Sequence, residues 1–312
     1  MRYIGSTTRS MPAEVDLATL SADEVQFRTA RFELMARIND MGHYGCIVFA
    51  DSYKGGGVFA EHLYPADAKT LRLEQRGEIT LDALYDKTKL YPADLPHITD
   101  KDVGAICNDK ARTHEVAGDL QPQTRIIASR DELATLHELD NGSGMVALKS
   151  FSGFGGEEVW IGKISELGQH VTLPEFPLLA QEFIESDKGV PGLTDGRHDV
   201  RILMLNGTAL GGSIRTPQPG GLLSNTHQGG TMRMLALAEL PKELLVFAAQ
   251  VDSRLPQKPR LYAADFMYSA PLGRWFLIEL NGSPGALPST FTPVGPVFQQ
   301  ELAKSLLTLA GE

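Results

Sequence analysis

The stretch Trp275-Phe-Leu-Ile-Glu-Leu-Asn-Gly-Ser-Pro284 sets a carboxylate and an amide into an otherwise apolar segment. The apolar run, closed by turn-forming residues, predicts a buried strand. Since side chains alternate between the two faces of a strand, Glu279 and Asn281 share one face. A second apolar run, Leu261–Met267, predicts the neighbouring strand and supplies Asp265.

Two carboxylates and an amide oxygen form a ligand set that suits Mg²⁺, which keeps several waters and prefers oxygen donors. The alternative is that these side chains are solvated at the ends of strands. Glu279, however, lies inside the apolar run, where a buried and unpaired carboxylate would be costly. The pattern therefore favours metal binding.

A glycine-rich loop lies earlier in the chain, in Leu148-Lys-Ser-Phe-Ser-Gly-Phe-Gly-Gly156. Glycines let backbone N–H groups approach phosphate oxygens, and the neighbouring Lys149 adds a positive charge. No helix-forming stretch follows, so we expect strand 145–149, the loop and strand 158–161 rather than a Walker A or Rossmann loop. A plain turn explains the glycines equally well when the loop is taken alone.

Two arginines, Arg201 and Arg215, lie on predicted strands 199–205 and 208–215, which Asn206-Gly207 joins as a type I′ hairpin. The polar loop 225–230 follows them. Guanidinium groups on adjoining strands can bind a transferring phosphoryl group or an acyl phosphate. The alternative is surface ion pairing with Asp195 or Asp199.

Composition narrows the class of protein further. The net charge of −10 argues against nonspecific nucleic-acid binding. The two cysteines have no disulfide or CxxC spacing, which fits a reducing cytoplasm. No apolar window is long enough to span a bilayer, and the first residues, Met1–Gly5, do not have the apolar core of a signal peptide. We expect a cytoplasmic α/β protein without nucleic-acid or membrane partners.

The remaining periodicity predicts alternating helices and strands. Capping pairs are expected at Ser21 with Glu24 and at Ser129 with Glu132. The other predicted helices are 21–40, 110–120, 240–254 and 297–310, and the other strands are 45–50, 69–73, 84–85, 124–128 and 178–184.

From about residue 105 onward, the order and spacing of these motifs resemble the ATP-grasp superfamily. The resemblance is strongest to the branch that contains glutathione synthetase and the RimK-type amino-acid ligases, and it covers roughly two-thirds of the chain. The motifs that carry it are Asn108-Asp-Lys110, the glycine-rich loop, Ala180–Ile184, HDVRILMLNG at 198–207, SIRTP at 213–217, NTHQGG at 225–230, and AADF with FLIELNGSP at 263–266 and 276–284.

The resemblance implies a mixed α/β (α+β) chain with the ATP-grasp fold and an N-terminal α/β pre-ATP-grasp domain. We expect that domain over residues 1–100. An ATP-grasp small subdomain with a glycine-rich lid would cover 101–172, and a C-terminal subdomain with the metal site would cover 173–312.

The resemblance also implies roles for individual residues. Lys110 and Lys149 would contact the ATP phosphates, and Asp265, Glu279 and Asn281 would hold two Mg²⁺ ions. Arg201, Arg215 and Asn225 would be catalytic. The remaining nucleotide-binding residues would be Ser152, Gly153, Gly155 and Gly156 in the lid, Gln181, Glu182, Phe183 and Ile184 at the adenine, and Gly229 and Gly230 beside the γ-phosphate.

The activity implied is ADP-forming ligation of a carboxylate to an amine through an acyl phosphate, on small-molecule or peptide substrates. Leu223-Ser-Asn225 replaces the Arg-Gly-Asn of glutathione synthetases, which argues against glutathione as the product. The alternatives are an ATP-grasp phosphotransferase and a nucleotide-binding protein without turnover. A homodimer stays open. Of two histidines near the motifs, His227 is the better candidate for acid–base chemistry than His198, and Cys107 is expected to be a packing residue.

Overall fold

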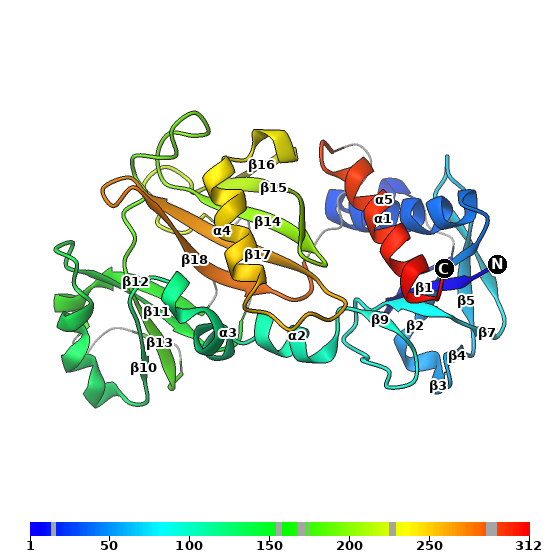
Figure 1. Ribbon diagram of the computed structural model, residues 1–312, viewed down its shortest axis with the longest axis horizontal. Helices are drawn as coiled ribbons and strands as arrows, with labels where there is room; N and C mark the ends of the chain where they lie inside the picture. The colour runs from blue at the N-terminus through cyan, green and yellow to red at the C-terminus, as the bar shows by residue number, and fades with distance from the viewer. Residues whose placement is uncertain (14–16, 154–157, 168–171, 174, 225–228, 285–291) are drawn as a thin grey trace. The chain divides into compact units, whose positions relative to one another are not determined.

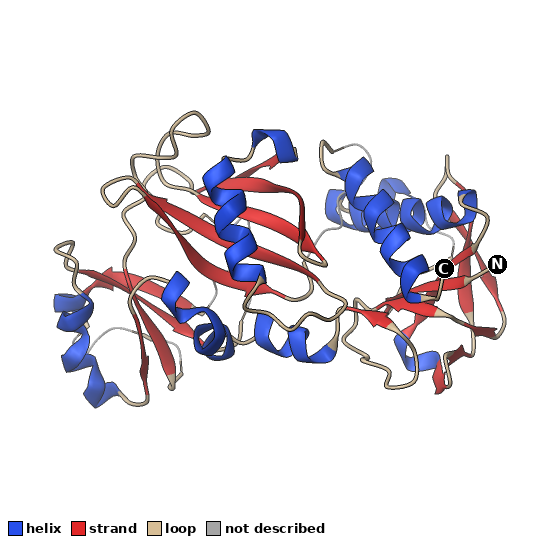
Figure 2. Cartoon of the chain, in the orientation of Figure 1, coloured by secondary structure: helices blue, strands red, loops and turns tan. Residues whose placement is uncertain are grey.

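The computed structural model describes residues 1–312 apart from 14–16, 154–157, 168–171, 174, 225–228 and 285–291. The chain divides into two compact units (Figure 1). The first contains residues 1–101, 258–261 and 283–312, and the second contains 102–257 and 262–282. Helices and strands alternate through both, which confirms the mixed α/β class (Figure 2).

The first unit is built on a six-stranded sheet in the order β6-β5-β2-β1-β8-β9. β1 is parallel to β2 and β8, and β8 is parallel to β9, whereas β5 and β6 are antiparallel. Helices α1 and α5 contact each other, and both contact this sheet. The elements are β1 (Tyr3–Thr8), α1 (Ala22–Asp40), β2 (Tyr44–Phe49), β5 (His62–Asp67), β6 (Arg72–Arg76), β8 (Ala83–Tyr85), β9 (His97–Ile98) and α5 (Gly295–Leu309), with a small sheet of β3 (Tyr53–Gly55), β4 (Val58–Phe59) and β7 (Ile79–Thr80).

The second unit contains two antiparallel sheets, β10-β13-β11-β12 and β16-β15-β14-β17-β18. Leucines of the 3₁₀ helix Arg130–Leu139 pack on the four-stranded sheet, and residues of α4 belong to the core of the five-stranded one. The elements are α2 (Lys101–Cys107), α3 (Lys110–Ala117), β10 (Thr124–Ile127), β11 (Met145–Ser150), β12 (Val159–Lys163), β13 (Leu178–Glu182), β14 (Asp199–Leu205), β15 (Thr208–Thr216), β16 (Thr231–Leu235), α4 (Lys242–Asp252), β17 (Leu261–Ser269) and β18 (Arg274–Asn281).

Local sequence signals predict some element ends well and others wrongly. The capping box at Ser21 and Glu24 is present, and the hairpin residues Asn206 and Gly207 have φ of 47° and 87°. The expected cap at Ser129 is wrong, because its side chain makes no capping hydrogen bond and the segment is a 3₁₀ helix. The strand expected at 69–73 begins only at Arg72, since Leu71 has a φ of 50°.

The domain boundaries expected from the sequence stay a prediction. One difference is visible: residues 283–312 belong to the same compact unit as the N-terminal residues, not to the unit that carries Asp265 and Glu279. Within the described part of the chain, no helix combines the length and the apolar character required to cross a bilayer.

Candidate active site

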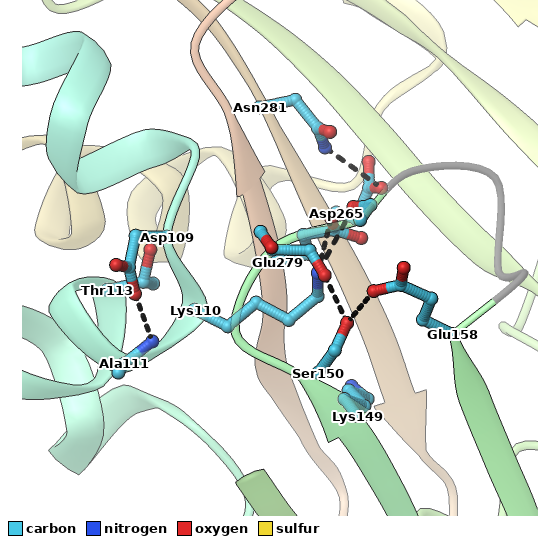
Figure 3. Close-up of polar contacts among 12 residues, drawn as sticks. Asp109, Lys110, Ala111, Thr113, Lys149, Ser150, Glu158, Asp265, Glu279 and Asn281 are labelled. Carbon is cyan, nitrogen blue, oxygen red and sulfur yellow. Dashed lines mark hydrogen bonds and ion pairs between the residues drawn. The ribbon is translucent and has the colours of Figure 1, made fainter. Parts of the chain in front are cut away.

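A pocket in the second unit gathers charged side chains from both of its sheets. β11, β12 and β13 line it from the four-stranded sheet, and β14, β15, β17 and β18 line it from the five-stranded sheet. Figure 3 shows several of these side chains turned toward one another.

Lys110 enters this pocket from the first turn of α3. The Asp109 carboxylate caps that helix by accepting hydrogen bonds from the N–H groups of Ala111 at 2.9 Å and Arg112 at 3.1 Å. The Lys110 ammonium lies 3.5 Å from a carboxylate oxygen of Glu279 (Figure 3). It also lies 3.3 Å from the carbonyl oxygen of Gly153. The cap therefore fixes the backbone from which Lys110 reaches the carboxylates.

Lys149 projects from β11 and is almost fully buried. Its ammonium donates to the side-chain oxygen of Gln181 at 2.6 Å, and the Gln181 amide donates to the Thr124 hydroxyl at 3.0 Å. Burial lowers the pKa of Lys149 to about 8, although the negative charge of Glu279 opposes that shift. Lys149 is thus a poorly solvated cation beside the carboxylates.

The end of β13 and the residues after it supply the next part of the pocket wall. The Glu182 N–H donates to the carbonyl of Gln123 at 2.8 Å, so that N–H is already used within the protein. The Asn141 amide donates to the Glu182 carboxylate at 3.1 Å and to the Phe183 carbonyl at 2.8 Å. The Arg197 guanidinium lies 5.3 Å from the centre of the Phe183 ring, which closes this end with a cation–π contact.

Asp265 on β17 is the centre of a buried ion network. Arg201 binds it with two hydrogen bonds, from Nε at 2.7 Å and from Nη2 at 2.6 Å. Arg215 adds a third at 2.9 Å, and its Nε donates to Asp199 at 2.6 Å. Both arginines are therefore held by carboxylates. For Arg215, the ion pairing with Asp199 is present, but it is buried rather than on the surface.

Burial and the two arginines push the pKa values of these carboxyl groups in opposite directions. Burial raises the pKa of Asp265, but Arg201 and Arg215 outweigh it and lower that pKa to about 2. For Asp199, burial prevails over Arg215 and raises the pKa to about 6. Asp265 is thus kept as an anion at neutral pH.

Asp265, Glu279 and Asn281 lie together as the sequence alternation predicts. Asp265 faces Glu279 in the β17–β18 register, and the Asn281 amide nitrogen lies 3.5 Å from an Asp265 oxygen (Figure 3). A bulge follows, because Phe266 pairs with Leu277 and leaves Ile278 as an extra residue. This all-oxygen donor set fits Mg²⁺, since each carboxylate oxygen has two acceptor positions and Asp265 Oδ1 accepts only one of the hydrogen bonds described above.

The predicted residues do not all reach the pocket wall. Its lining includes Lys110, Lys149, Gly153, Gln181, Glu182, Phe183, Ile184, Arg215, Asp265 and Glu279, whereas Ser152, Arg201, Gly229, Gly230 and Asn281 are not part of it. Arg201 and Asn281 nevertheless contact the wall residue Asp265. The predictions for Gly155, Gly156, Asn225 and His227 lie outside the described residues. The ligand roles assigned to the set stay predictions.

Several residues that line the pocket were not predicted from the sequence. Strand alternation could have found Ala147, two residues before Lys149, and Met267, two residues after Asp265. Ile278 could not be found in this way, because the bulge breaks the alternation. The other lining residues that were missed are Pro122, Ser150, Glu158, Val159, Ile161, Ser186, Arg197, Asp199, Leu222, Leu223 and Ser224.

His198 is a structural residue in this arrangement. It is fully buried, its Nε2 accepts from the Tyr268 N–H at 3.3 Å, and its Nδ1 lies 3.1 Å from the Gly196 carbonyl. Cys107 is buried in the core of the second unit, as expected for a packing residue.

Known proteins share this architecture. Residues 107–289 match the family model of the RimK-like ATP-grasp domain. Because the match spans more than half of the chain, the protein belongs to the RimK-like ATP-grasp family.

Curated relatives match only part of their own length. A "Probable alpha-L-glutamate ligase 2" of Hahella chejuensis is 28% identical over 186 residues, which cover 57% of this chain and 55% of the relative. A "Probable alpha-L-glutamate ligase" of Shewanella halifaxensis is 30% identical over 110 residues, covering 35% of this chain and 20% of the relative. The chain thus spans about half, or less, of these relatives.

Solved structures match along nearly the whole chain. The VanG D-Ala:D-Ser ligase from Enterococcus faecalis has a TM-score of 0.62 at 13% identity, with 99% of each chain covered. The ATP-grasp ligase PsnB, complexed with a phosphomimetic variant of its minimal precursor, Mg and ADP, has a TM-score of 0.60 at 13% identity, with 98% of each chain covered. At these identities the likeness shows the fold, which confirms the expected ATP-grasp architecture.

Proposed function

We propose that this protein is an ATP-dependent, ADP-forming ligase that joins a carboxylate to an amine. The observation that carries the proposal is the convergence of Lys110, Lys149, Asp265 and Glu279 in one pocket. Cations beside carboxylates suit a nucleoside triphosphate with its Mg²⁺, because the cations can bind the phosphates and the carboxylates can bind the metal ion. The names of the curated relatives and of the solved ligases support the same reaction class.

ATP would bind along the pocket, with its phosphates at Lys110 and Lys149. The adenine would lie near the apolar side chains of Ala147, Ile161 and Ile278. Because the Glu182 N–H is used by Gln123, we assign the backbone of Ile184 to adenine recognition. The lysines would neutralise the charge that spreads over the phosphoryl oxygens during transfer.

Asp265, Glu279 and Asn281 would hold Mg²⁺, two ions in our proposal. When bound, Mg²⁺ supplies positive charge that neutralises the phosphate oxygens. Arg201 and Arg215 keep Asp265 ionised and fix its orientation, so they prepare the ligand set as well as the substrate side of the pocket.

The reaction would proceed in two balanced steps. A carboxylate oxygen of the substrate attacks the γ-phosphorus of ATP, the bond to the β,γ-bridging oxygen breaks, and ADP leaves. The amine nitrogen then attacks the acyl carbon, phosphate leaves with the electron pair of the C–O bond, and the amine loses one proton. Arg215 lines the pocket and would stabilise the oxyanion at the acyl carbon.

The substrates would be amino acids or peptides, a class to which the names of the curated glutamate ligases point. The test is ADP release from Mg·ATP with a panel of amino acids and short peptides, alongside mass spectrometry for a new amide. Glu279→Ala should abolish release. The matched control Glu243→Ala, on the exposed face of α4, should leave it unchanged.

ADP release that requires both a carboxylate and an amine, and a product mass equal to their sum minus water, would establish the ligase. Release without an amine requirement, with the phosphate found on an acceptor, would replace it with a phosphotransferase. ATP binding without any release across the panel would favour a nucleotide-binding protein that does not turn over.

A further inference from the structure

The first unit has a strand arrangement that commonly binds ligands. β2 lies on one side of β1 and β8 lies on the other, so the strand order reverses between the parallel strands β1 and β8. In open α/β sheets, ligands bind outside the carboxyl ends of the strands at such a reversal. Ser6 on β1 and Tyr85 on β8 face each other in the register near these ends.

Three buried polar atoms at this place have no hydrogen-bond partner within the described chain. They are the Ser6 hydroxyl, the Tyr85 hydroxyl and Nε of Arg31 on α1. Ser6 is 0% exposed and Tyr85 is 2% exposed. Buried polar atoms are almost always partnered in native proteins, by protein, water or ligand. Three such atoms on one side of one sheet therefore need a common explanation.

Arg28, one helical turn before Arg31, shows that the chain can satisfy a buried guanidinium here. Its three nitrogens donate to the carbonyl groups of Leu71 at 3.0 Å, Pro12 at 2.7 Å and Ala13 at 2.7 Å. Arg31 has the same chemistry on the same helix, yet its Nε has no acceptor among the residues that the structure describes. We take this difference between neighbouring arginines as a sign that Arg31 serves a ligand.

The charges around these atoms favour an anion. The Lys87 ammonium lies 5.9 Å from the centre of the Tyr85 ring and donates to the Pro284 carbonyl. Burial, and to a smaller extent the charge of Arg31, lowers the pKa of Lys87 to about 7. A bound anion would relieve the repulsion between the two cations.

The Asp86 carboxylate, next to Tyr85 and Lys87 in the chain, accepts hydrogen bonds from other groups. Asp86 accepts from the Thr7 hydroxyl at 3.1 Å, the Thr88 N–H at 3.0 Å and the Tyr91 N–H at 2.7 Å. A carboxylate offers two oxygens that can accept from the Ser6 and Tyr85 hydroxyls and from the Arg31 Nε–H.

We propose that Ser6, Arg31, Tyr85 and Lys87 form a binding site for the carboxylate group of a small molecule or peptide. The two hydroxyls and the Arg31 Nε–H supply donors, and the two cations supply the charge. This site lies within the first unit and stands independently of the nucleotide pocket. It can therefore be measured without ATP.

The experiment is calorimetric titration of the full chain, without nucleotide, with acetate, N-acetylglycine and N-acetyl-L-alanine. N-acetylglycinamide is the neutral isostere, and inorganic phosphate is the competing anion. We expect saturable binding of at least one carboxylate at pH 6.5 and none of the amide. Arg31→Gln and Tyr85→Phe should each weaken it at least tenfold.

Thermal unfolding separates a ligand site from a structural one. Tyr85→Phe removes a hydroxyl that has no partner in the described chain, and it should not lower the Tm of the free protein. The control Tyr44→Phe should lower it, because the Tyr44 hydroxyl contacts His62 at 2.9 Å and Arg76 at 2.9 Å, but should leave carboxylate binding unchanged.

Absence of binding by all three carboxylates would overturn the proposal, as would binding that Arg31→Gln and Tyr85→Phe leave intact. Phosphate binding as tight as carboxylate binding, lost in the same variants, would refute the assignment of the ligand as a carboxylate.

Discussion

Lys149 carries the clearest prediction about pH. Its pKa is lowered to about 8 by burial, so it is protonated below about pH 8 and loses its charge as the pH rises through that value. A neutral amine cannot attract phosphate, and we therefore expect ADP affinity to fall above pH 8, by up to about tenfold per unit. Isothermal titration between pH 6.5 and 9.5 measures it.

Lys149→Arg is the matched variant for this experiment, because a guanidinium stays charged throughout the range. Its ADP affinity should vary much less above pH 8 than that of the wild type. The same decline in both proteins would mean that another group controls binding.

Asp265 holds two arginines, and removing its charge should destabilise the protein. Asp265→Asn keeps the shape but leaves Arg201 and Arg215 without their shared anion, which we expect to cost about 3 kcal/mol in the free energy of unfolding. Glu279→Gln is the control, since this partly exposed side chain contacts Lys110 at 3.5 Å and should cost less than about 1 kcal/mol.

Urea unfolding measures both losses, and Mg²⁺-dependent ADP binding should fall in both variants. Equal destabilisation by the two substitutions would contradict the central position of Asp265 in the ion network. The two carboxylates are thus expected to contribute differently to the free energy of unfolding, although both are proposed metal ligands.

β14 and β15 position Arg201 and Arg215 through a close backbone approach. A Cβ at Gly212 would lie 2.0 Å from the Arg201 carbonyl oxygen, and neither backbone can move cheaply. Gly212→Ala should therefore destabilise the protein by about 1–3 kcal/mol. In the control Gly77→Ala, the new methyl group meets nothing within 4 Å, so little change is expected. Equal urea midpoints for the two variants would argue against this packing role.

The strands around the site show what could be predicted from the sequence. Asn206-Gly207 predicts its hairpin because both turn positions require a positive φ, and this requirement is set by the local sequence alone. Strand alternation is also a local property, and it places Glu279 and Asn281 on one face of β18. The bulge at Ile278 depends on pairing with β17, and the buried arginine–aspartate network depends on three strands meeting. Neither leaves a local signal.

The two units differ in how far the sequence reveals them. The motifs that resemble the ATP-grasp family concentrate in the second unit, where Lys149, Asp265 and Glu279 lie within short recognisable stretches. In the first unit, Ser6, Arg31 and Tyr85 come from separate elements and share no motif, so only the folded chain brings them together. The sequence predicts an α/β domain there but not its chemistry.

The C-terminal helix α5 completes the first unit although the second unit lies between them in sequence. Phe298, Leu302 and Leu306 are buried, and the Gln299 amide donates to the Ala30 carbonyl of α1 at 3.1 Å. Part of the core of the first unit therefore comes from the last residues of the chain. Its stability should depend on α5 even though the helix is distant in sequence.

Leu302→Ala tests this dependence, with Leu244→Ala on α4 as its counterpart in the second unit. Both leucines are 0% exposed, and each truncation should cost about 2–5 kcal/mol. Because contacts are dense within units, we expect local effects in native-state hydrogen exchange measured by mass spectrometry. Leu302→Ala should speed exchange in residues 1–101 and 283–312, and Leu244→Ala should speed it in 102–257. Acceleration spread evenly over the chain by either variant would mean that the two units unfold as one cooperative body.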